Sequence, residues 1–394
     1  MLQRFQEFIQ QQHLFPVGEE VLLAVSGGRD SVAMLDLCRR AGIPFAVAHC
    51  NFHLRPGDCD RDQQFVRRLA ESAGAVFHTV DFDTRAVADS RGMSIEEAAR
   101  HLRYSWFSDL CRRHGFPCVA TAHHRDDSVE TFFLNLFRGT GIAGLQGIRP
   151  SAPFLGTTLV RPLLCFSRAD IDRYVAERHL EYVDDSTNAE LDARRNRIRL
   201  QLMPLLRELY PSVDATMAAN IVRLHDAGLL YREHLDQLRS RLLQPYPSRV
   251  PDLPFAILSV DLREVDSLAV PATVLFELLR PYGFNGATVA DILRTGSAAT
   301  GRLFFSSTHT AELHRGLLLL APTVQPAAAS APDVRPWRPG DRFRPKGMKG
   351  SRLVSDFLKD LHLSRIEKAF VKVKLSPDGR ILAVVGLRDA DQNP

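Results

Sequence analysis

The sequence lacks paired cysteines and long apolar runs. Its six cysteines are scattered through the first half of the chain, and none forms a Cys-x-x-Cys pair; they stand at positions 38, 50, 59, 111, 118 and 165. This spacing gives little support to a zinc ribbon, a disulfide framework or a dithiol redox site, so we expect reduced thiols that mostly serve packing.

No apolar run approaches the roughly 18–20 residues that a membrane-spanning helix needs. The N-terminal stretch MLQRFQEFIQQQHLF lacks the basic region and long apolar core of a signal peptide. We therefore expect a cytoplasmic protein that makes no use of a membrane. The 394 residues, of which 45% are hydrophobic and 24% charged, indicate an ordinary globular protein of two or three domains.

The net charge is only +4, but the charges are unevenly placed. Residues 335–380 contain thirteen Lys and Arg against five Asp and Glu, so this segment is strongly basic and the remainder is net acidic. A basic module on a near-neutral body indicates a polyanionic partner, with a merely solvated basic face as the alternative.

Short β-like runs alternate with helical patterns over the first two hundred residues. A capping box at Ser94 and Glu97 predicts the start of one helix. This alternation predicts an α/β fold, a Rossmann-like, doubly wound and mostly parallel sheet. The predicted strands are 21–26, 45–50, 75–82 and 117–123.

Three domains are expected. Residues 1–214 form the α/β domain, and 215–334 form a mainly helical middle domain that ends in a Pro/Ala-rich linker. Mixed short elements are expected from Pro245 to about residue 320. Residues 335–394 form a small, basic α+β domain in which SPDG, 376–379, supplies a hairpin turn.

The loop SGGRDS, residues 26–31, follows the first predicted strand and opens a helix. Backbone N–H groups and the positive helix end then point at one spot, which makes an anion cradle. Gly27 and Gly28 allow the turn and the close approach of a phosphate. The loop is neither a Walker A motif nor the Gly-x-Gly-x-x-Gly fingerprint. Asp30 would repel a phosphate unless Mg²⁺ lies between them.

A second cluster lies where the fourth strand becomes a helix: His123, Asp126, Asp127 and Glu130. Helical spacing places both aspartates near Glu130. Such carboxylates repel one another unless a cation intervenes, and Mg²⁺ or the ammonium group of a substrate would serve. No ligand spacing here demands a permanent zinc ion.

Other polar groups carry weaker signals. His49 and Asn51 follow the second strand, and Arg100 and Arg103 lie on one helix face; turn residues and a solvated face are the alternatives. The segment 184–199 ends in a run rich in arginine, which suits phosphate contacts.

Taken in order, these motifs resemble one family. The series SGGRDS, HCNFHLR, AARHLRY, AHHRDDSVET, RGTGIAGL, RPLL and DDSTN…RRNRIR is similar to the tRNA(Ile)-lysidine synthetases of the PP-loop ATP pyrophosphatase superfamily. The likeness covers roughly residues 20–205, and 340–360 resembles the family's terminal tRNA-contacting module. Two stretches depart from the family pattern, namely 367–376 and 51–53.

The resemblance implies ATP and Mg²⁺ as cofactors, and tRNA(Ile) with a CAU anticodon and L-lysine as partners. Cytosine O2 of the wobble base attacks the α-phosphate of ATP, and the lysine ε-amine then displaces AMP from C2. The family includes dimers, so a homodimer is one state to test; the sequence itself does not give the oligomeric state.

The roles that this resemblance implies fall into four groups. Catalysis falls to Asp30, Asp127 and Glu130, and magnesium binding to Asp30 and Asp127. ATP binding falls to Ser26, Gly27, Gly28, Arg29, Asp30, Ser31, His49, Asn51 and His123. Binding of tRNA or lysine falls to Arg100, Arg103, Asp126, Arg195, Asn196 and Arg199.

Four other functions compete with this one. A tRNA thiolase of the same superfamily generally needs a cysteine pair or an iron–sulfur ligand set. A small-molecule synthetase would not need the basic tail. A non-catalytic RNA-binding protein and a metal-dependent hydrolase built on His123, His124 and Asp127 are the remaining alternatives.

Overall fold

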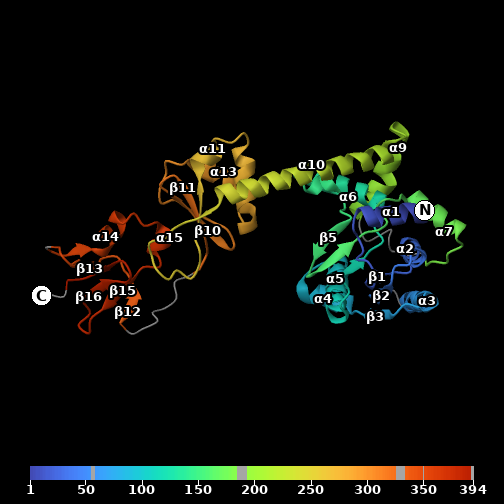
Figure 1. Ribbon diagram of the computed structural model, residues 1–394, viewed down its shortest axis with the longest axis horizontal. Helices are drawn as coiled ribbons and strands as arrows, with labels where there is room; N and C mark the ends of the chain where they lie inside the picture. Colours follow the sequence, from blue (N-terminus) through green and yellow to red (C-terminus); the bar gives the residue numbers. More distant parts are fainter. Residues whose placement is uncertain (55–57, 184–192, 325–332, 349, 392–394) are drawn as a thin grey trace. The chain divides into compact units, whose positions relative to one another are not determined.

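The computed structural model describes residues 1–54, 58–183, 193–324, 333–348 and 350–391 (Figure 1). Its contacts divide the chain into two compact units, Met1–Leu229 and Leu230–Pro394. The three-domain division expected from the sequence stays a prediction.

The first unit is built on a six-stranded sheet of order β3-β2-β1-β4-β6-β5. All neighbours pair in parallel except β5 and β6, which form an antiparallel edge. The strands are β1 (Val21–Ala24), β2 (Phe45–Asn51), β3 (Phe77–Asp81), β4 (Cys118–Ala120), β5 (Ser151–Phe154) and β6 (Thr157–Val160). The predicted parallel sheet and its four strands are therefore confirmed, and the edge pair β5–β6 adds to them.

Helices cover both faces of this sheet (Figure 1). They are α1 (Leu2–Gln11), α2 (Arg29–Arg40), α3 (Asp58–Ser72), α4 (Thr84–Arg91), α5 (Ile95–His114), α6 (Arg125–Arg138) and α7 (Arg168–Glu177). Successive strand residues point to opposite faces, so Leu23 packs in the core with α2 and α7 while Leu22 packs in the core with α5. The predicted capping box begins α5: Ser94 Oγ accepts from the Glu97 backbone N–H.

The strand order reverses between β1 and β4, whose neighbours in the sheet lie on opposite sides. In open parallel sheets, ligands bind beyond the carboxyl ends of the strands at such a reversal. The glycine loop follows β1 and the acidic cluster follows β4, so the fold brings these two motifs to the same edge.

A mostly helical segment follows. It consists of α8 (Ala193–Arg197), one π-helical turn η3 (Ile198–Leu202), α9 (Met203–Leu209) and the thirty-residue helix α10 (Val213–Leu242). The helical pattern predicted for this segment is confirmed.

The second unit begins with a five-stranded antiparallel sheet of order β7-β8-β11-β10-β9. Its strands are β7 (Gln244–Pro245), β8 (Leu258–Asp261), β9 (Leu303–Phe305), β10 (His309–His314) and β11 (Leu317–Pro322), with helices α11 (Leu262–Asp266), α12 (Pro271–Leu279) and α13 (Gly286–Thr295). The sequence predicts a mainly helical domain over residues 215–334 and does not predict this sheet. Its strands have only two to six residues, which is too short for a clear periodicity in the sequence.

A second small sheet forms the C-terminal part, in the order β12-β15-β16-β17. The elements of the C-terminal part are β12 (Val334–Pro336), β13 (Arg342–Phe343), β14 (Arg352–Leu353), α14 (Val354–Asp360), α15 (Arg365–Lys368), β15 (Lys372–Leu375), β16 (Ile381–Val384) and β17 (Arg388–Asp389). β13 and β14 pair with each other as a separate two-stranded sheet. The expected α+β character and the turn at 376–379 are confirmed, since the Gly379 N–H donates to the Ser376 carbonyl between β15 and β16.

A buried carboxylate joins the five-stranded sheet to helix α15 of the C-terminal part. Glu312 of β10 is 1% exposed and accepts hydrogen bonds from the backbone N–H groups of Arg365 and Ile366, both at 2.8 Å. Ile366 also packs against Ile257 and Leu319 of the first sheet. The C-terminal part is therefore held to this sheet by buried polar and apolar contacts.

Cys38, Cys50, Cys111, Cys118 and Cys165 are free thiols that are buried or half-buried, as expected. Among the residues that the structure describes, no helix is both long and apolar enough to cross a bilayer.

Candidate active site

The glycine loop makes its turn through backbone-to-hydroxyl bonds. The Ser31 hydroxyl donates to the Gly28 carbonyl at 2.8 Å and accepts from the Gly27 N–H at 3.2 Å, and the Gly28 N–H donates to Ser26 Oγ at 3.3 Å. Gly27 has φ +93°, and a Cβ there would lie 3.2 Å from Val66. Glycine is thus required at 27, and the loop ends with Gly28 as the N-cap of α2.

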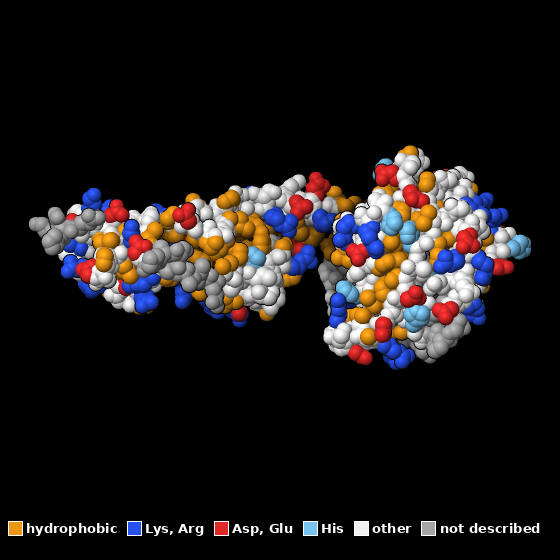
Figure 2. Space-filling model, turned by 90° about the horizontal axis from the view of Figure 1, so that it is seen from below, with side chains coloured by type: hydrophobic (Ala, Val, Ile, Leu, Met, Phe, Trp, Pro, Cys, Tyr) orange, Lys and Arg blue, Asp and Glu red, His pale blue; other side chains and the backbone are white. Residues whose placement is uncertain are grey.

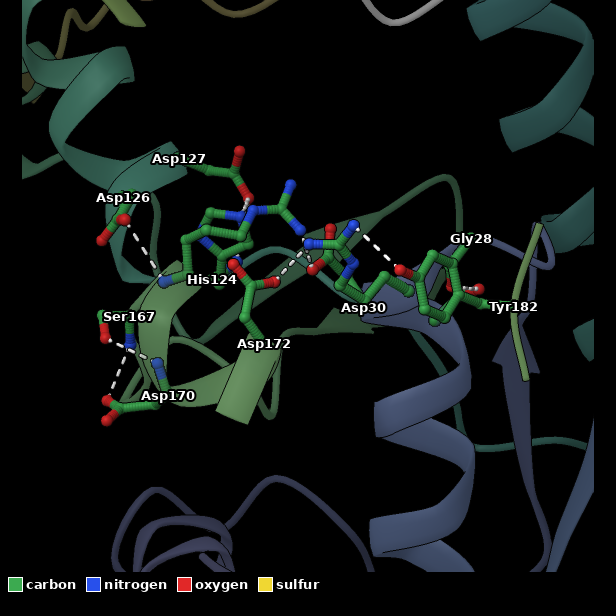
Figure 3. Close-up of polar contacts among 12 residues, drawn as sticks. Gly28, Asp30, His124, Asp126, Asp127, Ser167, Asp170, Asp172 and Tyr182 are labelled. Atoms are coloured by element: carbon green, nitrogen blue, oxygen red, sulfur yellow. Dashed lines mark hydrogen bonds and ion pairs between the residues drawn. The ribbon is translucent and has the colours of Figure 1, made fainter. Parts of the chain in front are cut away.

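Asp30 lies in the first turn of α2 and is paired across the site. The Arg168 guanidinium donates to its Oδ1 at 2.6 Å (Figure 3). Burial raises the pKa of Asp30, and the positive charge of Arg168 opposes that rise. Asp127 lines the same cavity as Asp30, and its negative charge also raises the pKa of Asp30.

Arg29 pairs with α7 one turn beyond Arg168. Its guanidinium donates to Asp172 at 2.6 Å and to the Tyr182 hydroxyl at 3.2 Å (Figure 3). It also lies over the Tyr182 ring, 4.7 Å from the centroid. Asp172 and Tyr182 therefore hold this cation at the edge of the loop.

A cavity of about 650 Å³ opens between the loop and the start of α6. Of the residues that the resemblance implicates, it is lined by Ser26, Gly28, Arg29, Asp30, Ser31, Arg103, His123 and Asp127. The residues that follow β1 and those that follow β4 thus line the same cavity, as the strand order predicts.

Asp127 begins α6 together with His124, the N-cap residue. Its Oδ2 accepts from the His124 backbone N–H at 2.9 Å. Burial by itself would raise the pKa of Asp127, but His124 and His123, the N–H bond and Arg199 together lower it. Asp127 is therefore a stable anion on the cavity wall, facing Asp30.

Glu130 is one turn further along α6 and does not line the cavity. Its side chain is 4% exposed and accepts two hydrogen bonds from Arg199, at 2.6 and 3.0 Å. Arg199 also reaches Asp127 Oδ1 at 3.4 Å. Burial raises the pKa of Glu130, and Arg199 opposes the rise. The cation expected between these carboxylates is thus supplied by the protein itself.

Asp126 does not join this cluster, although helical spacing places it near Glu130. Its Oδ2 accepts from the backbone N–H of Arg168 at 3.2 Å, so it satisfies a donor at the start of α7 (Figure 3). Asp126 therefore helps to position Arg168, and its contact with a substrate stays a prediction.

His49 and Asn51 of β2 do not line the cavity. His49 is 5% exposed, and its Nδ1 lies 2.9 Å from the Val25 carbonyl. The Asn51 amide donates to Asp60 and to Gln63 of α3, at 3.3 and 3.2 Å. Both side chains hold the carboxyl ends of strands in place, and their contact with ATP stays a prediction.

His123 lines the cavity with its ring Nδ1 3.0 Å from Thr121 Oγ1. Burial lowers its pKa to about 4, so its ring is neutral near pH 7. On α5, the Arg103 guanidinium lies over the Phe52 ring at 5.1 Å and reaches the cavity. The exposed Arg100 stacks on Tyr104 at 5.0 Å and does not reach it.

The arginine-rich turn sits beside α6. Arg195 donates to Thr131 Oγ1 at 3.1 Å and lies 3.5 Å from Glu130. Asn196 is half-buried on the same turn. The preceding motif DDSTN, 184–188, lies outside the described residues.

The residues present fit a magnesium ion that arrives with a nucleotide. Such an ion is usually held by one or two carboxylates plus phosphates. Asp30 and Asp127 supply two carboxylates that line one cavity, and the charge of Asp127 contributes to the raised pKa of Asp30. No group of three His, Cys, Asp or Glu able to hold a metal occurs among the described residues.

Sequence reasoning missed Arg168 and Asp172, both on α7 and both lining the cavity. The signal was present in RPLLCFSRADI, where Ser167 and Asp170 form a capping box that begins α7. Only the packing of α7 beside α2 brings these residues to the glycine loop.

A parallel sheet with a Ser-Gly-Gly loop at its order reversal and facing carboxylates defines a PP-loop nucleotide-binding protein. A family model described as PP-loop domain matches residues 1–206, and one described as TilS substrate binding domain matches 256–323. The first model alone covers more than half of the chain.

Curated relatives match this chain over most of its length. The chain is 38% identical to tRNA(Ile)-lysidine synthase from Bacteroides thetaiotaomicron, over 93% of this chain and 90% of that protein. It is 37% identical to the enzyme of that name from Parabacteroides distasonis, over 98% and 95%. A third, from Porphyromonas gingivalis, is 38% identical over 81% and 67%. The chain belongs to the tRNA(Ile)-lysidine synthase family.

Proposed function

We propose that this protein joins L-lysine to C2 of the wobble cytidine of tRNA(Ile) bearing a CAU anticodon. The reaction consumes ATP and passes through an adenylated cytidine, giving lysidine, AMP and pyrophosphate. One observation carries the proposal: the glycine loop, Asp30 and Asp127 face the same cavity, with Arg168 held against Asp30. Family membership favours this reaction over thiolation, hydrolysis or RNA binding alone.

The first step makes a bond between cytosine O2 and the α-phosphorus of ATP and breaks the bond from that phosphorus to the bridging oxygen. The leaving pyrophosphate needs donors and positive charge. The N–H groups of the glycine loop, the α2 N-terminus and Arg168 provide these. Asp30 and Asp127 would hold Mg²⁺, which neutralises charge on the phosphates as the pyrophosphate departs.

The second step joins the lysine ε-nitrogen to C2, and AMP leaves with the O2 oxygen. The amine must be neutral when it attacks, so a carboxylate first binds the ammonium form and a base then removes a proton. We assign Glu130 as the carboxylate that binds the lysine ammonium group, because Glu130 is buried, has a raised pKa and lies one turn from Asp127. Asp127 is left to Mg²⁺ because it faces Asp30.

RNA contacts are assigned to two regions. Near the cavity, Arg100, Arg103, Arg195 and Asn196 present cationic and planar groups suited to unstacked bases and phosphates of an anticodon loop. In the second unit, exposed Lys and Arg side chains occur with some Asp and Glu among them (Figure 2). Two weak contacts on one RNA raise each other's effective concentration. A cytoplasmic location and a homodimer complete the proposal.

The test is one reaction containing the protein, Mg-ATP, radiolabelled lysine and an unmodified tRNA(Ile) CAU transcript. Lysine incorporated into RNA and AMP released are followed together. We expect both to appear, and neither with a methionine tRNA. AMP without lysine on the RNA would retain the adenylation step and refute lysine as the nucleophile.

A further inference from the structure

The proposed lysine site already contains a cation, the guanidinium of Arg199. It makes two hydrogen bonds to Glu130 and approaches Asp127. A lysine ammonium would need the same carboxylate oxygens. Since the Glu130 side chain is only 4% exposed, there is little room for both cations at once.

The Arg199–Glu130 ion pair is strong enough to compete with the ammonium group of free lysine for the Glu130 carboxylate. A two-bond guanidinium–carboxylate pair is among the stronger polar contacts in proteins, and burial of the carboxylate strengthens it further. Free lysine loses translational and rotational entropy when it binds, whereas Arg199 is already attached to the chain. Lysine therefore binds poorly while Arg199 stays in place.

The backbone that carries Arg199 departs from regular α-helix. Arg199 lies in the π-helical turn η3, where the Met203 N–H donates to the Ile198 carbonyl five residues earlier. Single π turns inside helices are rare and concentrate at functional sites. Converting this turn to α-helix shifts its register by one residue, about 100° around the axis, which would carry Arg199 away from Glu130.

A phosphate group is the natural alternative partner for Arg199. The Arg199 side chain is 35% exposed, so part of it lies at the surface. Arg194, Arg195 and Arg197 lie within the preceding five residues, so an RNA backbone that approaches this turn meets four guanidinium groups. Arg199 does not line the cavity that would hold ATP, so RNA rather than ATP is the closer source of phosphate.

We propose that Arg199 occupies the lysine ammonium site of the free protein and that an RNA phosphate draws it away, so that lysine binds only after the RNA. This inference rests on the proposed function. Its consequence is an order of binding: the amine is admitted only when the cytidine it must attack is present.

The test measures binding of radiolabelled lysine by equilibrium dialysis, without chemistry, in the presence of an ATP analogue with a methylene bridge between the α- and β-phosphorus atoms. Wild type and Arg199→Gln are compared with and without saturating tRNA(Ile) CAU transcript, and wild type is also measured without the analogue. We expect RNA to strengthen lysine binding to wild type on the order of tenfold. Arg199→Gln should bind lysine tightly without RNA and show no RNA effect.

The matched control is Arg223→Gln, which removes the same charge from an exposed position of α10 outside the arginine-rich turn. It should keep the RNA effect. Arg199→Lys, which retains the charge but loses the two-bond geometry, serves if Arg199→Gln unfolds; its lysine affinity without RNA should exceed that of wild type. Thermal unfolding identifies a misfolded variant.

Three results would overturn the inference: equal lysine affinity of wild type with and without RNA, weaker lysine binding by Arg199→Gln or Arg199→Lys in the absence of RNA, or an increase caused by the ATP analogue alone. Lysine incorporation by wild type with ATP is measured in parallel. Incorporation without the RNA effect refutes only the inference, whereas no incorporation refutes the proposed function.

Discussion

Arg168, the first residue of α7, donates a hydrogen bond to Asp30 of α2 at 2.6 Å, across 138 positions of the sequence. Burial raises the pKa of Asp30 and Arg168 opposes that rise, so the pair keeps an anion beside the phosphate cradle. Asp126 in turn accepts from the Arg168 backbone N–H. The start of α6, the start of α7 and the glycine loop are thereby joined.

Asp30→Asn should abolish AMP formation while leaving tRNA binding nearly unchanged. The amide keeps the shape of the side chain but cannot offer an anion to Mg²⁺, so we expect a loss of about 100-fold or more in AMP release. Asp109→Asn, an exposed change on α5, is the control and should retain activity. Equal loss of AMP release and of RNA affinity would mean that Asp30 is structural.

Arg168→Gln should move the acid limb of the pH–rate profile for AMP release. Without Arg168, the pKa of the buried Asp30 rises, so its anion is lost at higher pH and the limb shifts upward by roughly one unit. Arg173→Gln, an exposed change on the same helix, should leave the profile in place. A uniform loss of rate at every pH would argue against a role for Arg168 through Asp30.

Neutralising basic residues of the C-terminal part should weaken tRNA binding and not ATP binding. Deleting residues 336–394 tests the same role, with a far larger loss of tRNA than of ATP binding, but also strips the N–H partners from buried Glu312. The triple change Arg342→Gln, Lys346→Gln and Lys374→Gln, all at exposed positions, avoids this.

For the triple variant, we expect the slope of log affinity against log salt concentration to fall in magnitude by about 2–3. Each phosphate contact that is lost removes the release of about one counterion on binding. The comparison is a triple variant of the first unit at exposed Arg39, Arg112 and Arg173, which removes equal charge. Identical salt slopes in both triple variants would refute a local RNA surface in the C-terminal part.

His123 should make the protein less stable in acid. Its pKa is about 4 when folded against an ordinary value of 6.5, so the unfolded chain takes up the proton first as the pH falls. The free energy of unfolding should therefore decrease between pH 6.5 and 4, by at most about 1.4 kcal/mol per pH unit from this group. Denaturation of wild type and His123→Asn at several pH values measures the difference.

The matched control for that series is His101→Asn, an exposed histidine of α5. It should keep the slope of wild type. If His123→Asn also keeps the wild-type slope, burial of the His123 ring does not cause the decrease in unfolding free energy at acid pH.

The sequence by itself determined the sheet and the location of the site. Strand–helix alternation, the capping box at Ser94 and the loop 26–31 are local patterns, and a parallel sheet follows because alternating strands and helices pack in that way. The edge to which Asp30 and Asp127 come could also be predicted, since carboxyl ends of parallel strands meet there.

Tertiary structure decided which charges meet. Helical spacing places Asp126 beside Glu130, yet Asp126 faces Arg168 and Glu130 faces Arg199. These partners lie 42 and 69 positions away, and no local periodicity encodes contacts of that range. The five-stranded sheet of the second unit likewise depends on pairing between strands such as β8 and β11, because antiparallel partners are chosen by packing and register rather than by the sequence of either strand.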